Sequence, residues 1–166
     1  MRIRPAEPPD AEAIRTIYNA EVVSSETTTF DIVPRTQEEQ ASWLARHQGA
    51  HPAVVAVDEH AGAEVVLGFG ALSTFRTRPA YATTVENSVY VDRAHRGRGV
   101  GRAVLEELVR LAASHGFHTV VARIVGGNEA SIALHRSCGF EVVGVEREVG
   151  RKHGRWIDVV ELQRML

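Results

Sequence analysis

Residues 96–102 are Arg96-Gly97-Arg98-Gly99-Val100-Gly101-Arg102, and this stretch decides the fold that the sequence predicts. It lies between an alternating segment, 85–91, and an apolar-periodic segment that begins at Val100. Glycine lets the backbone turn tightly and approach a ligand closely. The first N–H groups of a helix have no partner within the helix, and the helix dipole adds positive charge there. The stretch therefore predicts a phosphate-binding loop between a strand and a helix.

The spacing of these glycines does not fit the two commonest phosphate-binding motifs. The dinucleotide pattern fails because its last glycine would fall on Arg102, and the Walker pattern fails because no Gly-Lys-Ser/Thr follows. Three arginines surround the loop, so it could hold more than one phosphate charge. A plain glycine-rich turn with solvated arginines is the alternative that the motif alone leaves open.

Downstream of the loop, the sequence predicts two helices, a strand and a hairpin. Val100, Val104 and Leu108 recur at helical spacing, and Asn128 is placed to cap a later helix. The expected elements are a helix over 100–115 that ends at His115-Gly116, a strand over 119–124, a helix from Asn128 that stops at Gly139, and hairpin strands over 140–149 and 156–162.

Upstream of the loop, strands and helices also alternate. Asp10 is a plausible N-cap for a first helix, and Thr36 with Glu39 forms a capping box for a second. The expected elements are a strand over 2–5, helices that begin at 10 and 36, a polar loop over 24–34, strands over 53–57, 65–72 and 85–91, and a loop over 76–80. The pattern predicts one α/β domain over residues 1–166.

Composition excludes several classes of protein. The chain is 44% hydrophobic and 24% charged, which is typical of a globular domain rather than a disordered one. The net charge of −2 argues against a nucleic-acid-binding protein. No apolar stretch approaches the roughly 20 residues of a membrane span, and no signal peptide is visible. A single cysteine, Cys138, points to a reducing cytoplasm, and the His47/His51 and His115/His118 pairs lack the further ligands of a metal site.

Several separated segments resemble the GNAT superfamily of N-acetyltransferases. Arg96-x-x-Gly99-x-Gly101 matches the loop that binds the pyrophosphate of acetyl-CoA in that superfamily. Further segments resemble its phosphinothricin and methionine sulfone (sulfoximine) acetyltransferase subgroup: 28–30, 43–44, 84–91, 95–102, 128–140 and 150–159. The resemblance implies an α/β (α+β) GNAT fold. That fold is a mixed, mostly antiparallel twisted sheet of about seven strands, splayed in the middle and flanked by about four helices.

The resemblance also implies which residues bind acetyl-CoA. The backbone of Val89, Tyr90 and Val91 would pair with the pantetheine arm, while Asn128 would reach a pantetheine amide and Ser137 would lie near the arm. Simpler interpretations remain open for all of them: core strand residues, a plain N-cap for Asn128 and a satisfied helix hydroxyl for Ser137. No metal is expected.

The resemblance implies Glu86 and His135 as the candidate catalytic residues. An acceptor amine is mostly an ammonium ion at neutral pH, so a carboxylate such as Glu86 can take its proton directly or through one water. The alternative for Glu86 is a strand-surface carboxylate in a salt bridge. His135 stands where many members of the superfamily have a tyrosine acid, and it could be an acid, a relay, a substrate contact or a structural residue. Cys138 is expected to be a buried structural thiol rather than a nucleophile.

The resemblance also implies that Phe30, Arg76 and Arg78 lie on the acceptor side, because the subgroup uses these segments for its acceptor. An arginine would pair with the carboxylate or phosphinate of an amino-acid-like acceptor, and Phe30 would pack on its short side chain. The alternative for the arginines is solvated loop charge. The subgroup often has an aromatic residue at the position of Thr83, so the smaller threonine is expected to widen or reshape the pocket. The identity of the acceptor therefore stays open, while acetyl transfer does not depend on this position.

The expected activity is direct transfer of an acetyl group from acetyl-CoA to the primary amine of phosphinothricin, methionine sulfoximine, methionine sulfone or a related amino acid. Such an enzyme would detoxify these compounds, and the resemblance implies a cytoplasmic homodimer without nucleic-acid or membrane partners. Two other functions stay open: acetylation of peptide N-termini, and acyl-CoA binding by a regulatory module without catalysis.

Overall fold

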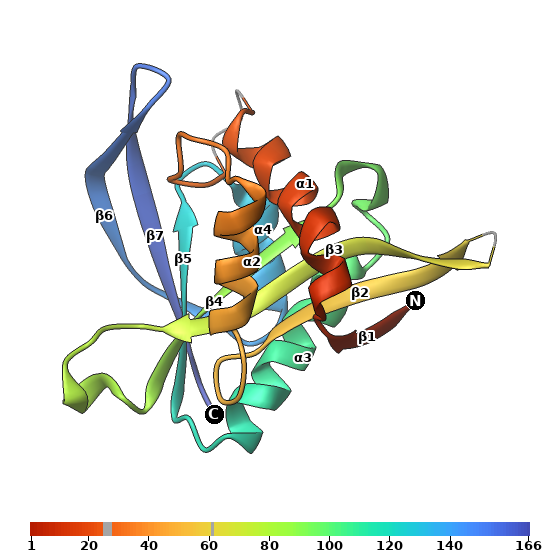
Figure 1. Ribbon diagram of the computed structural model, residues 1–166. Coiled ribbons are helices and arrows are strands. Elements are labelled where there is room, and N and C mark those ends of the chain that lie inside the picture. The colour runs from red at the N-terminus through yellow and green to blue at the C-terminus, as the bar shows by residue number, and fades with distance from the viewer. Residues whose placement is uncertain (25–27, 61) are drawn as a thin grey trace.

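The computed structural model describes residues 1–24, 28–60 and 62–166 (Figure 1). The loop expected over 24–34 includes residues 25–27, which lie outside this part of the chain. The helices of the described residues are α1 (Ala11–Val22), α2 (Gln37–Arg46), α3 (Val100–Ser114) and α4 (Glu129–Ser137). The strands are β1 (Arg2–Pro5), β2 (Ala53–His60), β3 (Ala63–Thr74), β4 (Thr84–Val91), β5 (Thr119–Val125), β6 (Glu141–Lys152) and β7 (Arg155–Met165).

The seven strands form one mixed sheet in the order β1-β2-β3-β4-β5-β7-β6. All neighbouring strands are antiparallel except β4 and β5, which run parallel. The pairing of β4 with β5 extends only from Thr84–Thr119 to Asn87–Ala122, although β4 continues to Val91 and β5 to Val125. The two strands therefore diverge beyond Asn87. This mixed, centrally splayed sheet with four flanking helices confirms the predicted fold class.

Helices cover both faces of the sheet. In Figure 1, α1 and α2 lie in front of the sheet, where buried residues of α1 pack with Val55 and Phe69. Apolar residues of α3, among them Val104 and Leu108, pack on the opposite face with Val54. Because side chains alternate along a strand, β4 presents neighbouring residues to the two different helix layers.

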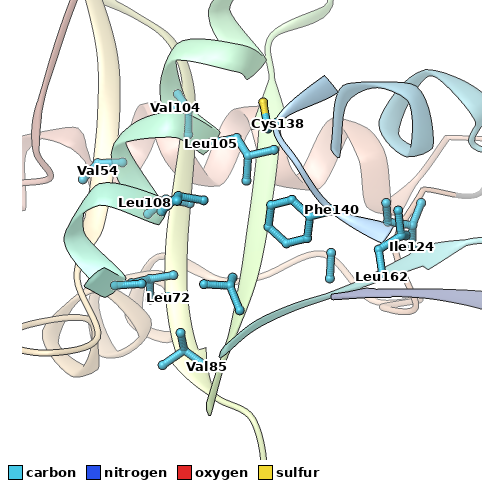
Figure 2. Close-up of a cluster of buried hydrophobic side chains, with 14 of the residues drawn as sticks. Val54, Leu72, Val85, Val104, Leu105, Leu108, Ile124, Cys138, Phe140 and Leu162 are labelled. Atoms are coloured by element: carbon cyan, nitrogen blue, oxygen red, sulfur yellow. The ribbon is translucent and has the colours of Figure 1, made fainter. Parts of the chain in front are cut away.

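The largest buried cluster lies between α3, α4 and the sheet (Figure 2). Figure 2 shows Phe140 between Leu105 and Leu108 of α3 on one side and Ile124 and Leu162 on the other. Phe140 directly precedes β6 and belongs to a cluster that contains residues of α3 and of strands on both sides of the gap. The core therefore joins the two halves of the sheet on the α3 face, although the pairing of β4 with β5 ends at Asn87.

The expected elements are all present, and the strands are longer than their apolar runs. The β2–β3 hairpin continues to His60 and Ala63 because backbone pairing does not require burial of the side chains. The capping box of Thr36 and Glu39 and the cap by Asn128 are confirmed. Asp10 does occupy the N-cap position of α1, but its carboxylate makes no cap hydrogen bond to that helix. It accepts instead from Arg4 at 2.7 and 2.9 Å.

Among the described residues, no helix is long and apolar enough to cross a membrane.

Candidate functional site

A cavity of about 710 Å³ opens where β4 and β5 diverge. Its wall includes residues from both helix layers because it passes through the gap in the sheet. The predicted site residues that line it are Phe30, Glu86, Val89, Tyr90, Val91, Arg96, Gly97, Gly99, Val100, Gly101, Arg102, Asn128 and His135. The fold thus brings residues from 30 to 135 into a single cavity.

The glycine loop, residues 96–102, forms one end of the cavity. Gly97 and Gly99 have φ values of 74° and 80°, in the left-handed region that favours glycine. Gly99 is the N-cap of α3 and no side chain caps this helix, in contrast to Thr36 at α2 and Asn128 at α4. The first N–H groups of α3 are therefore without a side-chain acceptor, which suits a phosphate ligand.

The arginines of the glycine loop differ in position. Arg96 and Arg102 line the cavity, whereas Arg98 is not among its lining residues. Arg96 also donates to the buried carboxylate of Glu21 at 2.7 Å. The structure thus brings two of the three predicted arginines to the site and leaves Arg98 outside it.

The upper part of β4 offers its backbone to the cavity. Val89, Tyr90 and Val91 pair with Gly70, Phe69 and Gly68 of β3 on one side. On the other side, the pairing with β5 has already ended at Asn87. Backbone groups along that edge are available to an extended ligand, which is the arrangement expected for a pantetheine arm.

Asn128 and Ser137 lie on α4 and differ in their relation to the cavity. Asn128 lines it, and its Oδ1 accepts from the Ser131 N–H at 3.2 Å, so the residue is also a helix cap. Ser137 is exposed, donates to the Leu134 carbonyl at 2.7 Å, and is not among the lining residues. The geometry favours the simpler interpretation of Ser137 as a satisfied helix hydroxyl.

Glu86 faces the cavity from the α1 side of β4. Burial raises the pKa of its carboxyl above the ordinary 4.5; the charge of Arg123 opposes this shift, and Glu161 and Glu146 add to it. Arg123 itself forms ion pairs with Glu146 and Glu161. Glu86 is therefore a carboxylate whose proton affinity has been raised toward the range useful for a general base.

His135 is 3% exposed and is held at both ring nitrogens. Nδ1 lies 2.8 Å from the Ser131 carbonyl, and Nε2 lies 3.0 Å from Oδ1 of Asn87. Asn87 in turn donates to the Val121 carbonyl at 3.2 Å, across the last paired position of β4 and β5. Burial lowers the pKa of His135, against the hydrogen bond to Ser131. These contacts make His135 an anchor between α4 and β4.

Another part of the cavity lining is the Phe30 wall, residues 28–31. Thr29 Oγ1 and Asp31 Oδ2 lie 3.0 and 2.5 Å from the Tyr18 hydroxyl of α1. The Phe30 ring lies against Gly150 of β6, where an added Cβ would meet Cε1 at 2.3 Å.

The β6–β7 hairpin holds this wall in place. Lys152 Nζ donates to the Thr29 carbonyl at 3.1 Å, and His153 Nε2 lies 3.0 Å from the Ser24 carbonyl. Lys152 is buried, and burial lowers its pKa. Two segments more than 120 residues apart thus form one side of the site.

Arg76, Arg78 and Thr83 are not among the residues that line the cavity of this chain. They lie in the β3–β4 connection, which Figure 1 shows at the end of the sheet opposite the β6–β7 hairpin tip. The Arg76 guanidinium lies over the rings of Phe75 and Tyr81, 4.9 and 5.3 Å from their centroids. The structure does not bring these arginines together with Phe30 and Glu86.

Sequence reasoning missed three buried polar residues around the cavity: Glu21, Asn87 and Lys152. A signal for Glu21 was available, because it follows Ile14 by seven residues and so falls on the buried stripe of α1. Asn87 similarly occupies an inward position of β4. Lys152 gives no such signal, because its burial depends on the distant Phe30 wall.

The cavity combines a helix N-terminus that suits phosphate with a strand edge that suits an extended arm, which are the features expected of a transferase with a phosphate-bearing carrier. The family model "Acetyltransferase (GNAT) domain" matches residues 3–160, and this chain belongs to the GNAT family of acetyltransferases. Enzymes of this family take the acetyl group from acetyl-CoA.

Two curated relatives and one solved structure illustrate the similarity. A phosphinothricin N-acetyltransferase of Streptomyces coelicolor is 39% identical over 166 residues, covering 100% of this chain and 96% of the relative. An L-methionine sulfoximine/L-methionine sulfone acetyltransferase of Pseudomonas paraeruginosa is 38% identical over 97% of this chain and 92% of the relative. The structure of a phosphinothricin acetyltransferase from Sinorhizobium meliloti in complex with acetyl-CoA has a TM-score of 0.92 and 40% identity, covering 99% of this chain and 88% of that one.

Within the described part of the chain, no group of three or more His, Cys, Asp or Glu side chains could hold a metal ion. Cys138 is buried in the last turn region of α4, as expected for a structural thiol.

Proposed function

We propose that this enzyme transfers the acetyl group of acetyl-CoA to the primary amine of a small amino-acid-like acceptor of the phosphinothricin, methionine sulfoximine or methionine sulfone type. The observation that carries the proposal is the single cavity that joins the glycine loop to Glu86 through the gap between β4 and β5. The identity with enzymes named for these acceptors supports the acceptor class.

Acetyl-CoA supplies an activated acetyl group on a thioester. The N–H groups at the start of α3, with Arg96 and Arg102, hold the pyrophosphate, because unpaired N–H groups and arginines both favour anions. The unpaired edge of β4 at Val89–Val91 aligns the pantetheine arm. A backbone N–H near Val91 donates to the thioester carbonyl and stabilises the negative charge that develops on its oxygen.

Glu86 removes the proton of the acceptor ammonium, directly or through one water. The ammonium gives up its proton to the carboxylate, and the resulting amine attacks the carbonyl carbon to form a C–N bond. The C–S bond then breaks, the nitrogen loses its second proton, and the CoA thiolate leaves and takes up a proton to become free CoA. The raised pKa of Glu86 favours the removal of the first proton because it brings the proton affinity of the carboxylate closer to that of the acceptor amine. His135 holds α4 against β4 through Asn87, so its contribution is to keep the two walls of the cavity in register.

The Phe30 wall forms the acceptor side. Phe30 is 44% exposed and lines the cavity, so its ring is accessible to a short side chain. Arg76 and Arg78 remain candidates for the carboxylate or phosphinate of the acceptor, and in that role they have to reach the cavity from the β3–β4 connection or from a second copy of the chain. Thr83 lies in that same connection.

The working unit in this proposal is a cytoplasmic homodimer, with residues 1–166 as one N-acetyltransferase domain. The exposed valines of the edge strand β6, with Trp156 of β7, offer an apolar surface for the second copy: Val142, Val143, Val145 and Val149. The presence of one cysteine is consistent with a reducing compartment. Acetylation removes the charge of the acceptor amine, so detoxification of glutamate-like inhibitors is the proposed role.

The proposal is tested by thiol release from acetyl-CoA with a panel of amines. The panel contains phosphinothricin, methionine sulfoximine, methionine sulfone, ordinary amino acids, a polyamine and a short peptide. We expect turnover on the first three to exceed that on the rest. Turnover on the peptide alone would favour N-terminal acetylation, and acetyl-CoA binding without transfer to any amine would favour a regulatory module.

A further inference from the structure

Glu21 is a buried carboxylate that joins the two ends of the cavity. It lies in the last turn of α1, and its side chain is 3% exposed. Oε1 accepts from Arg93 Nε at 3.0 Å and from Arg96 Nη2 at 2.7 Å, while Oε2 accepts from Thr28 Oγ1 at 2.6 Å. One carboxylate thus contacts both the glycine loop and the Phe30 wall.

The surroundings of this carboxylate favour its charged form. Burial alone would raise the pKa of Glu21, but hydrogen bonds from Thr28 and Arg93 and the charge of Arg96 outweigh it and lower the pKa below the ordinary value. A negative charge near the C-terminal end of a helix is unfavourable for that helix. The glutamate therefore does not stabilise α1 itself. Its charge is stabilised by the two arginines and the threonine hydroxyl that donate to it.

Two partners of Glu21, Arg96 and Thr28, line the cavity at different places. Arg96 lines the end where the pyrophosphate binds, and its side chain is 44% exposed, so its guanidinium can contact Glu21 and a ligand together. Thr28 begins the wall that continues through Phe30 to Asp31. Arg93 donates through Nη2 to Ser24 Oγ at 2.6 Å, which adds a second tie to the end of the α1 region.

We propose that Glu21 is a positioning residue that couples acetyl-CoA binding at the glycine loop to the arrangement of the acceptor wall. Its two oxygens fix Arg96 on one side and Thr28 on the other. When the pyrophosphate accepts hydrogen bonds from Arg96, the interaction of Arg96 with Glu21 weakens. The carboxylate of Glu21 then accepts a stronger hydrogen bond from Thr28. This inference rests on the proposed function for the assignment of the two ends to donor and acceptor.

The first test uses acetyl-CoA alone, with the dissociation constant measured by calorimetry on the full chain. Thr28→Val keeps the shape of the side chain but removes the donor to Glu21, so Arg96 is held more tightly by the carboxylate. We expect acetyl-CoA to bind roughly threefold more weakly, because only a part of the energy of one hydrogen bond to a charged group is transmitted to the glycine loop. Thr28→Ser retains the hydroxyl and should bind within about twofold of the unmodified chain.

A double-mutant cycle identifies Glu21 as the link. In a Glu21→Gln background, Thr28→Val should no longer change the dissociation constant, because the charged acceptor of its hydroxyl has been removed. Thr29→Val is the matched control, since Thr29 contacts Tyr18 and not Glu21. Its effect should be the same in both backgrounds. Equal effects of Thr28→Val in both backgrounds, or no effect in either, would overturn the coupling.

Steady-state kinetics separate positioning from a purely structural role. With saturating acetyl-CoA, Thr28→Val should raise the acceptor KM roughly three- to tenfold and leave kcat within about twofold. A purely structural defect would instead lower kcat and the melting temperature with KM unchanged. Glu12→Gln, another ion-paired glutamate of α1 that faces away from the cavity, should change neither constant.

The outcomes for the two proposals differ. If the unmodified chain fails to bind acetyl-CoA, the proposed function fails and the coupling fails with it. If acetyl-CoA binds but none of the panel amines is acetylated, the acceptor assignment fails, while the calorimetric cycle still decides whether Glu21 links the two sites. If acetyl-CoA binds and Thr28→Val has no effect, only the role of Glu21 is wrong.

Discussion

The glycine loop and the Phe30 wall line the same cavity from two sides, and they are built in different ways. The glycine loop takes its form from residues within one short segment: Gly97 and Gly99 set the backbone, and Val100 begins the helix. The Phe30 wall takes its form from distant partners, with Lys152 holding Thr29 and Gly150 leaving room for Phe30.

This difference predicts which part of the cavity a substitution alters. A change in the glycine loop acts on the loop itself, because its conformation depends on local φ values. A change in the β6–β7 hairpin acts on the acceptor wall, because the hairpin supplies the contacts that the wall lacks by itself. Glu86 belongs to neither the glycine loop nor the Phe30 wall, since it lines the cavity from β4.

The largest effect is expected for Glu86→Gln, which leaves both ends of the cavity intact. Without a carboxylate to accept the ammonium proton, kcat should fall by about 100-fold or more. The dissociation constant of acetyl-CoA, measured by calorimetry, should stay within about twofold. Glu107→Gln on α3, which removes an ion pair outside the cavity, is the control. Unchanged kcat in Glu86→Gln would remove Glu86 from the mechanism.

A change at Gly99, which is not among the described hydrogen-bond partners of Glu21, should affect acetyl-CoA much more than the acceptor. Gly99→Ala places a Cβ at φ of 80°, which costs roughly 1–2 kcal/mol and shifts the first N–H groups of α3. We expect the KM for acetyl-CoA to rise about tenfold while the acceptor KM stays within about twofold. Gly116→Ala has the same φ of 80° beyond the other end of α3, so it should cost similar stability without changing either KM. An equal rise of both KM values in Gly99→Ala would contradict the prediction that the glycine loop acts mainly on acetyl-CoA binding.

A change at Gly150 should affect the acceptor more than acetyl-CoA, because Gly150 lies against Phe30, whereas Glu21 contacts the wall at Thr28. In Gly150→Ala the new Cβ would lie 2.3 Å from Cε1 of Phe30, so the ring has to move out of its place in the wall. We expect the acceptor KM to rise roughly fivefold and acetyl-CoA binding to be unchanged, since overpacking costs about 1 kcal/mol or more. Gly144→Ala, also on β6 but with no atom within 4 Å of the new Cβ, is the matched control. A Gly150→Ala enzyme with an unchanged acceptor KM would mean that Phe30 does not contact the acceptor.

The smallest effect is expected in the pH profile of Glu146→Gln. Glu86 accepts a proton only when it is ionised, so kcat/KM should be present above its pKa and be lost as the pH falls through it. Glu146 raises that pKa and also pairs with Arg123, whose charge lowers it. Removal of the Glu146 charge should therefore move the acidic limb of the kcat/KM profile to lower pH, with the plateau at higher pH unchanged. A shift to higher pH would contradict the charge arrangement around Glu86.

Local patterns predicted the elements of the fold well, because the signals that begin and end them are short. The capping box at Thr36 and the N-cap at Asn128 are both in place, and α3 ends at Ser114, directly before His115-Gly116. Asp10 shows the limit of such signals. Its position was predicted correctly, but its carboxylate binds Arg4, because an arginine on the neighbouring strand is a stronger partner than the helix N–H groups.

The residues of the candidate site also fall into those with a short sequence signal and those that depend on distant partners. The glycine loop was found from glycine spacing, which is visible over a few residues. Glu86 was proposed because its segment resembles the acetyltransferase subgroup, since strand alternation alone does not distinguish a general base from a surface carboxylate. Glu21 and Lys152 were not found, because their roles depend on partners brought close only by folding. Arg76, Arg78 and Ser137 have the right chemistry for the roles expected of them, but they are not among the residues that line the cavity of this chain.

The sequence by itself determined the type of site: a helix that begins on glycines attracts phosphate wherever it lies, and an alternating strand places Glu86 on one face and Asn87 on the other. Only the tertiary structure decided which groups meet across the cavity. The divergence of β4 from β5, the burial that raises the pKa of Glu86, and the contacts of Glu21 and Lys152 all arise between segments distant in sequence. Hydrogen bonding and burial act over a few ångströms in space, and sequence spacing does not report such distances between remote segments.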